Sequence, residues 1–317
     1  MLSYILKRIL QAIPTLLIVI TVSFFLMRLA PGGPFDGERQ LPPEIEANLK
    51  AAYHLDQPLL TQYGLYMKDL LHGDLGPSFR NKDFSVTEQI KQGFPVSLTI
   101  GLAAIVMALL VGIPLGIIAA LRRNRALDYL VMGVALGGIA VPSFVIAPLL
   151  ALVFGIMLKW LPVGGWPVSG TWWQYLPFLL LPVTALAIQQ IASIARLTRA
   201  SMIEVLGQPF IRTAQAKGLS TSQVIVKHAL RPALLPVLSY LGPAIAGIIT
   251  GSVVIEQIFT LPGIGRFFVQ GALNRDYTLV MGVVVFYAVL IMLMNLIVDV
   301  LYCVLDPQIR YDDSDDQ

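Results

Sequence analysis

The chain has 317 residues, of which 56% are hydrophobic and only 13% are charged, and its formal net charge is +3. Because soluble domains carry about 25% charged residues, this composition excludes an ordinary soluble fold, and so small a net charge gives no indication of nucleic-acid binding. The single cysteine, Cys303, excludes a disulfide within the chain, and the three histidines, His54, His72 and His228, lie too far apart to indicate a metal site.

Six long apolar segments predict six transmembrane helices. They cover approximately residues 9–29, 96–121, 129–158, 175–197, 235–258 and 279–303. A helix needs about 20 apolar residues to cross the hydrocarbon core, and an isolated span can satisfy its backbone in lipid only as a helix. The first span is longer than the apolar region of a signal peptide, so we expect an uncleaved anchor. The predicted fold class is therefore an all-α integral membrane protein.

Basic residues predict the orientation of these spans, because lysine and arginine gather in cytosolic loops. Lys7 and Arg8 precede the first span, and further basic residues lie between the second and third spans and between the fourth and fifth. These segments alternate along the chain and so fall on one side of the membrane. We therefore expect both termini in the cytosol, with residues 304–317 as a solvated acidic tail.

The segment 30–95 is long, mixed in charge and, on this topology, faces outward. Pro43 can begin a helix at its first turn, and a second helix is expected over Pro58–Leu71, with Gly73 just beyond its end. These signals predict a small folded subdomain. It either covers the outer ends of the spans or contacts a partner, and the sequence leaves both open. The predicted division of the chain is residues 1–29, 30–95, 96–303 and 304–317.

Small residues and prolines inside the spans predict how the helices pack. Glycines four residues apart let helices approach closely in lipid, and three such pairs occur: Gly112/Gly116, Gly133/Gly137 and Gly247/Gly251. Prolines inside or near the spans each remove a backbone donor and are expected to bend their helices, and they are Pro114, Pro142, Pro148, Pro182 and Pro236.

Polar residues within spans are informative because they are costly in lipid. Gln189 and Gln190 lie in the fourth span, Glu256 lies near the outer end of the fifth, and Asn295 and Asp299 share one face of the last. They are candidates for a translocation path. The alternative is hydrogen bonding between helices and, for Asp299, a basic partner at the cytosolic face. No group of these residues resembles a proton relay or a catalytic site, which disfavours an ion-coupled carrier and an intramembrane enzyme.

The cytosolic segment 198–232 has the clearest local signals. Pro209 can start a short helix, Lys217 suits the negative pole at its end, and Gly218 is a natural residue just after a helix. Ser220-Thr-Ser-Gln223 then matches a capping box for the next helix. The pattern predicts a compact projection that docks another protein. An amphipathic helix lying on anionic lipid is the alternative.

This segment resembles the cytoplasmic loop of permeases from binding-protein-dependent ABC importers, which carry a Glu-Ala-Ala-x3-Gly pattern. Here Arg212-Thr213-Ala214 stands at the Glu-Ala-Ala positions, with Gly218 in register. Only the last alanine and the glycine match, so the role of the family's glutamate is not carried over. The Arg-Thr-Ala-x-Ala-Lys-Gly variant is similar to the peptide-transporter branch of the family.

Six further segments, in the right order, extend the resemblance over nearly the whole chain. They are residues 13–15, 27–32, 73–78, 193–199, 261–265 and 274–277. Together they are similar to the B-type permeases of oligopeptide ABC importers, and so imply the type I importer permease fold in a bacterial inner membrane. Related permeases serve dipeptides, glutathione, murein peptides or nickel complexes, and these stay as alternative substrates.

The resemblance also implies partners. They are a homologous C-type permease, two ATP-binding subunits, a periplasmic or lipid-anchored solute-binding protein, the peptide and the surrounding lipid. The chain has no Gly-x4-Gly-Lys-[Ser/Thr] phosphate loop, so we expect no cofactor and no catalytic residue in it. ATP and Mg²⁺ belong to the ATPase subunits. The residues implied to contact an ATPase are Pro209, Phe210, Arg212, Thr213, Ala214, Lys217 and Gly218.

The outward loop 259–278 holds a second candidate site. Leu261, Pro262, Gly263, Ile264 and Gly265 are expected to form a tight turn. We expect this turn to contact the solute-binding protein or to gate the cavity. A plain turn between two spans is the alternative.

Overall fold

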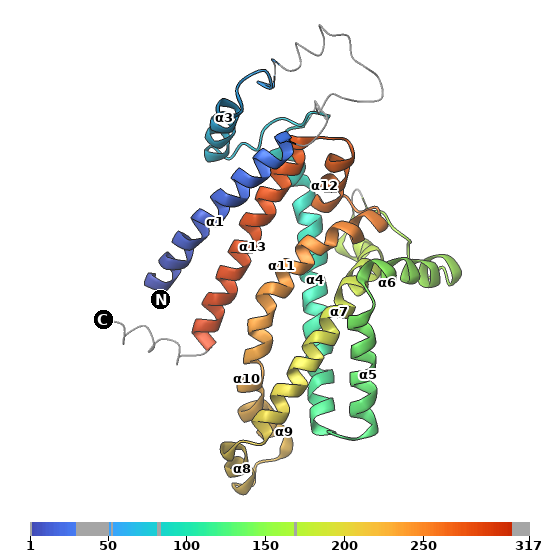
Figure 1. Cartoon of the computed structure of the whole chain (residues 1–317). Coiled ribbons are helices and arrows are strands. Elements are labelled where there is room, and N and C mark those ends of the chain that lie inside the picture. Colours follow the sequence, from blue (N-terminus) through green and yellow to red (C-terminus); the bar gives the residue numbers. More distant parts are fainter. Residues whose placement is uncertain (1, 30–50, 52, 81–83, 168–169, 306–317) are drawn as a thin grey trace.

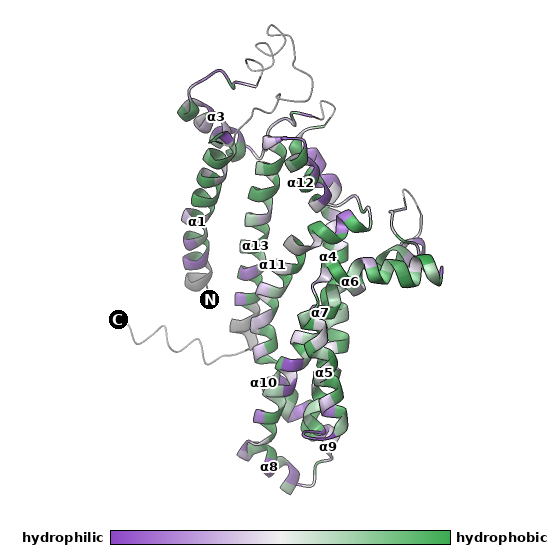
Figure 2. Ribbon diagram, turned by 45° about the vertical axis from the view of Figure 1, so that its right-hand side comes forward, coloured by the Kyte–Doolittle hydropathy of each residue, from purple (hydrophilic) through white to green (hydrophobic). Residues whose placement is uncertain are grey.

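The computed structural model describes residues 2–29, 51, 53–80, 84–167 and 170–305. Every element named in these ranges is a helix, and the long helices run roughly along one axis (Figure 1). Five are long and apolar enough to cross a membrane, and a bent pair brings the number to six. The five are α1 (Leu2–Leu29), α4 (Val86–Leu121), α7 (Trp172–Leu206), α11 (Leu235–Ile258) and α13 (Tyr277–Leu305). The predicted all-helical membrane fold is confirmed, and Figure 2 shows hydrophobic residues along these helices.

The third predicted span, residues 129–158, is wrong as a single helix. α5 (Ala126–Ala140) is followed by α6 (Ser143–Leu150) and the π-helix η1 (Ala151–Met157), and the two parts meet at 101°. Pro142 causes the break, since proline disfavours a helical conformation of the residue before it. Accordingly, Val141 is extended, with φ −93° and ψ 120°. The second part projects sideways from the bundle instead of continuing along it (Figure 1).

Helices α4 and α7 pack closely, and glycine makes this approach possible. A Cβ atom on Gly112 would lie 2.9 Å from the Ile191 carbonyl oxygen, and one on Gly116 would lie 2.6 Å from that of Ala195. The prediction of close packing is therefore confirmed for this pair. The same prediction is wrong for Gly133 and Gly137 within this chain, because a Cβ on either residue would meet no heavy atom within 4 Å.

Helix α3 (Leu59–Leu71) confirms the second helix expected in the external segment. Pro58 precedes its first turn, and Gly73 follows with φ +76°. The helix is fastened to α1 by aromatic rings and by the Tyr63 hydroxyl, which lies 2.8 Å from the Thr21 hydroxyl. The helix expected from Pro43 and the tail residues 306–317 lie outside the described residues.

The short helices mark the two ends of the molecule. α8 (Pro209–Ala216), α9 (Thr221–Val224), the π-helix η2 (Ile225–Ala229) and α10 (Leu230–Ala233) lead from α7 into α11. α12 (Ile264–Leu273) joins α11 to α13 at the other end, near α3. We call these the α8 end and the α3 end (Figure 1).

Candidate coupling surface and its supporting contacts

Helix α8 has well-defined ends that follow from its sequence. Pro209 occupies the first helical position, where no backbone donor is needed. At the other end Gly218 adopts φ +80°, its amide donates to the Gln215 carbonyl at 2.9 Å, and the Leu219 amide donates to that of Ala214 at 3.4 Å. This pair of bonds is a Schellman motif. Both predicted boundaries are therefore confirmed.

The two faces of α8 have different roles. Ile211 is fully buried and Ala214 is 6% exposed, and both pack into an apolar cluster with Met202 and Val224. Ala214 therefore supports the helix and presents little surface to a partner. The other residues predicted for ATPase contact are exposed, and they are Pro209, Phe210, Arg212, Thr213, Lys217 and Gly218. The sequence analysis missed Ile211, although its spacing of three from Ala214 signals one buried helix face.

The connection from α8 to α11 is also stiff. Both reciprocal bonds of the predicted capping box are present: the Ser220 amide donates to Gln223 Oε1 at 3.1 Å, and the Gln223 amide donates to Ser220 Oγ at 3.4 Å. Because the box satisfies two amides that a helix start leaves without partners, α9 begins at a defined residue directly after α8. The start of α8, the end of α8 and the start of α9 are therefore each fixed at a defined residue.

An ion pair that the sequence analysis missed braces α7 above this projection. The guanidinium of Arg199 on α7 binds both carboxylate oxygens of Asp128 on α5, with Nη2 2.7 Å from Oδ2. Asp128 is 1% exposed and also accepts the Asn124 amide at 2.9 Å. The sequence indicated Arg199 as a basic residue of the segment 193–199, which carries the family resemblance, but gave it no partner. The available clue was Asp128 itself, an acid in the first turn of an apolar helix.

At the α3 end, buried carboxylates hold the loops. Asp276 is 1% exposed and accepts hydrogen bonds from the Ser78 hydroxyl, the Phe79 amide at 3.2 Å and the Leu279 amide at 3.1 Å. The external segment is thereby tied to the first turn of α13. Two segments that carry the family resemblance, 73–78 and 274–277, thus meet at this one carboxylate.

The tight turn expected over residues 261–265 is shorter than predicted, because Ile264 and Gly265 are the first two residues of α12, and the whole segment lies inside the protein. Glu256, which is fully buried, accepts the Ser252 hydroxyl and the Gly265 amide, each at 2.8 Å, and the Ile264 amide donates to Ser97 Oγ at 2.9 Å. Leu261, Gly263, Ile264 and Gly265 are buried in consequence, and Pro262 is partly exposed. Within this segment only Pro262 therefore offers surface to a solute-binding protein.

Of the five candidate path residues, Glu256 holds the start of α12, and the other four occupy two separate places. On α7, Gln189 Nε2 donates to the Val141 carbonyl at 3.1 Å, and Gln190 Oε1 accepts the Tyr240 hydroxyl at 2.7 Å. These bonds brace the break between α5 and α6 and the contact with α11. They correspond to the interhelical bonding that the sequence offered as the alternative.

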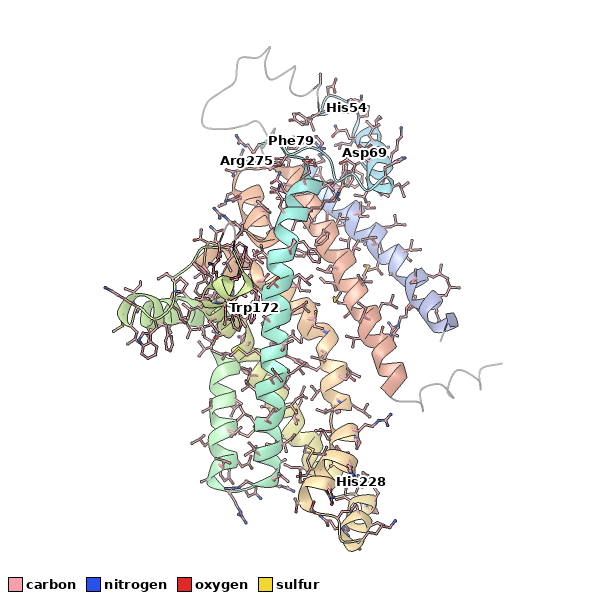
Figure 3. The ribbon with its side chains drawn as sticks, turned by 180° about the vertical axis from the view of Figure 1, so that it is seen from behind. His54, Asp69, Phe79, Trp172, His228 and Arg275 are labelled. Carbon is pink, nitrogen blue, oxygen red and sulfur yellow. The ribbon has the colours of Figure 1, made fainter. Side chains whose placement is uncertain are left out.

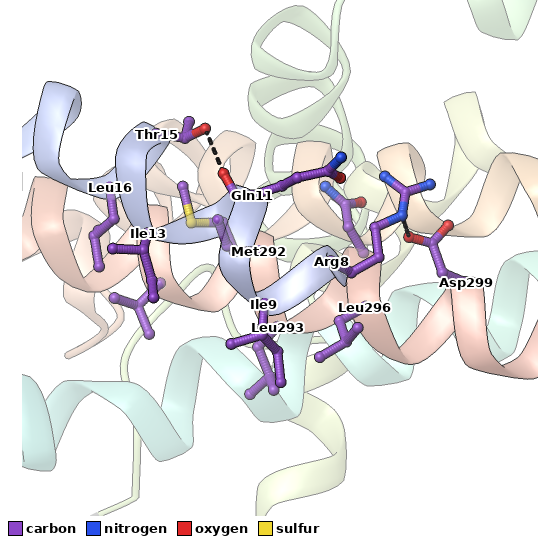
Figure 4. A pocket seen from close by; sticks show the side chains of 13 residues that line it. Arg8, Ile9, Gln11, Ile13, Thr15, Leu16, Met292, Leu293, Leu296 and Asp299 are labelled. Carbon is purple, nitrogen blue, oxygen red and sulfur yellow. Dashed lines mark hydrogen bonds and ion pairs between the residues drawn. The ribbon is translucent and has the colours of Figure 1, made fainter. Parts of the chain in front are cut away.

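The other two path residues lie on α13 beside a crevice. Asp299 pairs with Arg8 at 3.3 Å, and Asn295 lines the same crevice of about 420 Å³ between α1 and α13 (Figure 4). The basic partner expected for Asp299 is therefore present.

Comparison with known proteins decides the family. A family model described as "Binding-protein-dependent transport system inner membrane component" matches residues 112–311, and a model for the N-terminal part of such components matches residues 1–103. The chain belongs to this family. It is therefore a multi-pass inner-membrane permease subunit without a cofactor of its own, and it works within an ABC transporter complex whose ATPase lies in other subunits.

Two relatives match essentially end to end. The Escherichia coli (strain K12) protein named "Oligopeptide transport system permease protein OppB" is 58% identical over 98% of this chain and 100% of its own length. The Bacillus subtilis (strain 168) protein named "Dipeptide transport system permease protein DppB" is 46% identical over 98% of each chain.

Solved structures support the fold. A chain of the inward-facing MetNI methionine ABC transporter superposes with a TM-score of 0.58 at 16% identity, covering 69% of this chain and 96% of that one. This likeness shows the fold of an ABC importer permease.

Proposed function

We propose that this chain is the B-type permease subunit of an ATP-driven importer of oligopeptides, and that it forms half of the translocation path with a homologous C-type permease. The observation that carries the proposal is the full-length similarity, at 58% identity, to a protein named as an oligopeptide permease. The weaker match to a protein named as a dipeptide permease makes dipeptides the second candidate substrate.

We infer that the exposed face of α8 receives the force that drives transport. ATP binding would draw two ATPase subunits together, and a helix seated in one of them would carry that movement to α7 and α11. Bundles that rock about a central cavity then open alternately to the two sides. Such a lever must not bend, and the Schellman motif, the capping box and the buried Ile211 all oppose bending of α8.

We propose the orientation that the basic residues predict. The α8 end and both chain termini would face the cytosol of a bacterium, and the α3 end would face the solute-binding protein. The partly exposed Pro262 and its buried turn would then sit at the outer gate. There Ser97 on α4 and Glu256 on α11 accept hydrogen bonds from the Ile264 and Gly265 amides and so fix the start of α12.

A reconstitution experiment tests the proposal. Liposomes that contain this chain, the C-type permease and both ATPases should take up a labelled tripeptide only when the solute-binding protein and ATP are supplied. Liposomes with a hydrolysis-deficient ATPase are the control and should take up none. Uptake by this chain alone, without nucleotide, would instead support a stand-alone carrier.

A further inference from the structure

A small pocket lies at the α3 end, where α1, α3, the loop before α4 and the start of α13 meet. It has a volume of about 250 Å³. Figure 3 shows three residues of this region, His54, Asp69 and Phe79, gathered at that end of the molecule. The lining residues used below are Arg28, Gln62, Tyr66, Asp69 and Phe79.

Three of these residues carry a buried polar atom without a hydrogen-bond partner in the described part of the chain. They are Arg28 Nε, Gln62 Oε1 and Tyr66 Oη. Gln62 is only 7% exposed, and its own Nε2 is satisfied by the carbonyl oxygens of Leu55 and Gln57. Buried polar groups in folded proteins nearly always have a partner. Three exceptions around one pocket therefore indicate a missing ligand.

The unsatisfied atoms define the chemistry of that ligand. Arg28 Nε and the Tyr66 hydroxyl are donors, and Gln62 Oε1 is an acceptor. Burial raises the pKa of Tyr66 to about 12, so its hydroxyl keeps its proton at neutral pH. The guanidinium of Arg28 lies over the Phe24 ring, 5.3 Å from its centre, which holds the charge in place. Two donors, one of them charged, suit a carboxylate, and the acceptor suits a neighbouring N–H.

We propose that this pocket binds the C-terminal carboxylate of a short peptide, with the last amide N–H donating to Gln62 Oε1. The assignment rests on the proposed function, since it places a peptide at the outer face. The volume is below the roughly 300–1,000 Å³ of pockets that hold whole drug-sized ligands, so the pocket takes the end of a peptide. Asp69 also lines the pocket, and its carboxylate disfavours a simple anion as the ligand. A peptide differs from a simple anion because it also carries N–H groups.

The test uses the assembled importer without its solute-binding protein, in nanodiscs of neutral lipid, with trialanine as the probe. Calorimetry should detect binding of trialanine, and binding of its C-terminal amide should be at least about tenfold weaker, because the charged acceptor is lost. Tyr66→Phe removes one donor and should weaken trialanine binding about five- to tenfold.

Tyr63→Phe is the matched control. Tyr63 lies on the same helix, does not line the pocket, and has its hydroxyl beside that of Thr21. This variant should bind trialanine like the unmodified importer. Equal binding of trialanine and its amide, unchanged binding by Tyr66→Phe, or no binding at millimolar trialanine would overturn the assignment. So would loss of trialanine binding when anionic lipid is added, since the site would then belong to a lipid headgroup.

The same preparation separates this inference from the proposed function. ATP-dependent tripeptide uptake with the solute-binding protein present tests the importer as a whole. If uptake is normal but trialanine does not bind to the pocket, only the assignment of the pocket is refuted. Absent uptake by the unmodified complex would instead refute the proposed function.

Discussion

Gly218 shows how one residue can set the geometry of a coupling surface. Its φ of +80° lies in the left-handed region, yet a Cβ there would meet no heavy atom within 4 Å. The position therefore requires glycine for its backbone conformation and not for space. A β-branched residue would be held in a conformation that costs it about 1–2 kcal/mol, so α8 would lose its defined end.

We therefore expect Gly218→Val to lower ATP-dependent peptide uptake severalfold while the chain still inserts into the membrane. Gly218→Asn is the matched control, because asparagine tolerates the left-handed region better than other residues, and it should retain most of the uptake. Uptake is measured in proteoliposomes and insertion by immunoblotting of membranes. Normal peptide-stimulated ATP hydrolysis by the valine variant would argue against the lever role of α8.

Local signals explain what could be predicted from the sequence about these residues. Pro209, Gly218 and the Ser220 box act on their own or adjacent backbone, so their effects can be inferred without coordinates. Pro142 likewise indicated a bend, although not one of 101°. Glu256 could not be placed in the same way. The Ser252 hydroxyl lies one turn earlier on the same helix, but the Gly265 amide lies beyond the end of α11, and only the tertiary fold brings it to Glu256.

Between elements, the informative contacts join parts of the chain that are far apart in sequence. Ser78 and Asp276 are 198 residues apart, and Asp128 and Arg199 are 71 apart. No spacing rule links such residues, so the sequence analysis recognised the segments that contain Ser78, Asp276 and Arg199 without explaining them. In the structure each pair fixes one element against another.

The ion pair between α5 and α7 allows a quantitative prediction. Asp128→Asn leaves the Arg199 guanidinium without its carboxylate. Removing one partner of a fully buried pair costs about 3–5 kcal/mol, but the Arg199 side chain is 25% exposed, so we expect about 1–3 kcal/mol. The unfolding temperature of the purified complex should fall accordingly.

A double-mutant cycle separates the ion pair from general damage. Asp128→Asn combined with Arg199→Gln should destabilise the protein less than the sum of the two single changes, because the second removes the stranded charge. Arg122→Gln, an exposed change in the turn between α4 and α5, serves as the control and should shift the unfolding temperature little. Strict additivity of the two changes would mean that the pair contributes nothing of its own.

At the scale of the whole molecule, the structure separates two ends that must perform different tasks. One end presents the exposed face of α8, whose buried residues tie it to α7. The other presents α3, α12 and the loops held by Asp276 and Glu256. A transporter driven by ATP needs the first in the cytosol and the second outside. Orientation in the membrane therefore decides which end receives the force from ATP hydrolysis and which end admits the substrate.

Orientation can be measured with single cysteines. Cys303 is first replaced by serine, since it is the only native cysteine. Thr61→Cys on α3 and Thr213→Cys on α8 then place a thiol at exposed positions at opposite ends. In intact spheroplasts a membrane-impermeant maleimide should label residue 61 and leave residue 213 unlabelled, and inverted vesicles should give the reverse. Labelling of both positions from one side would contradict the membrane crossing itself. A reversed pattern would place α8 outside, away from ATP, and the lever mechanism could not operate.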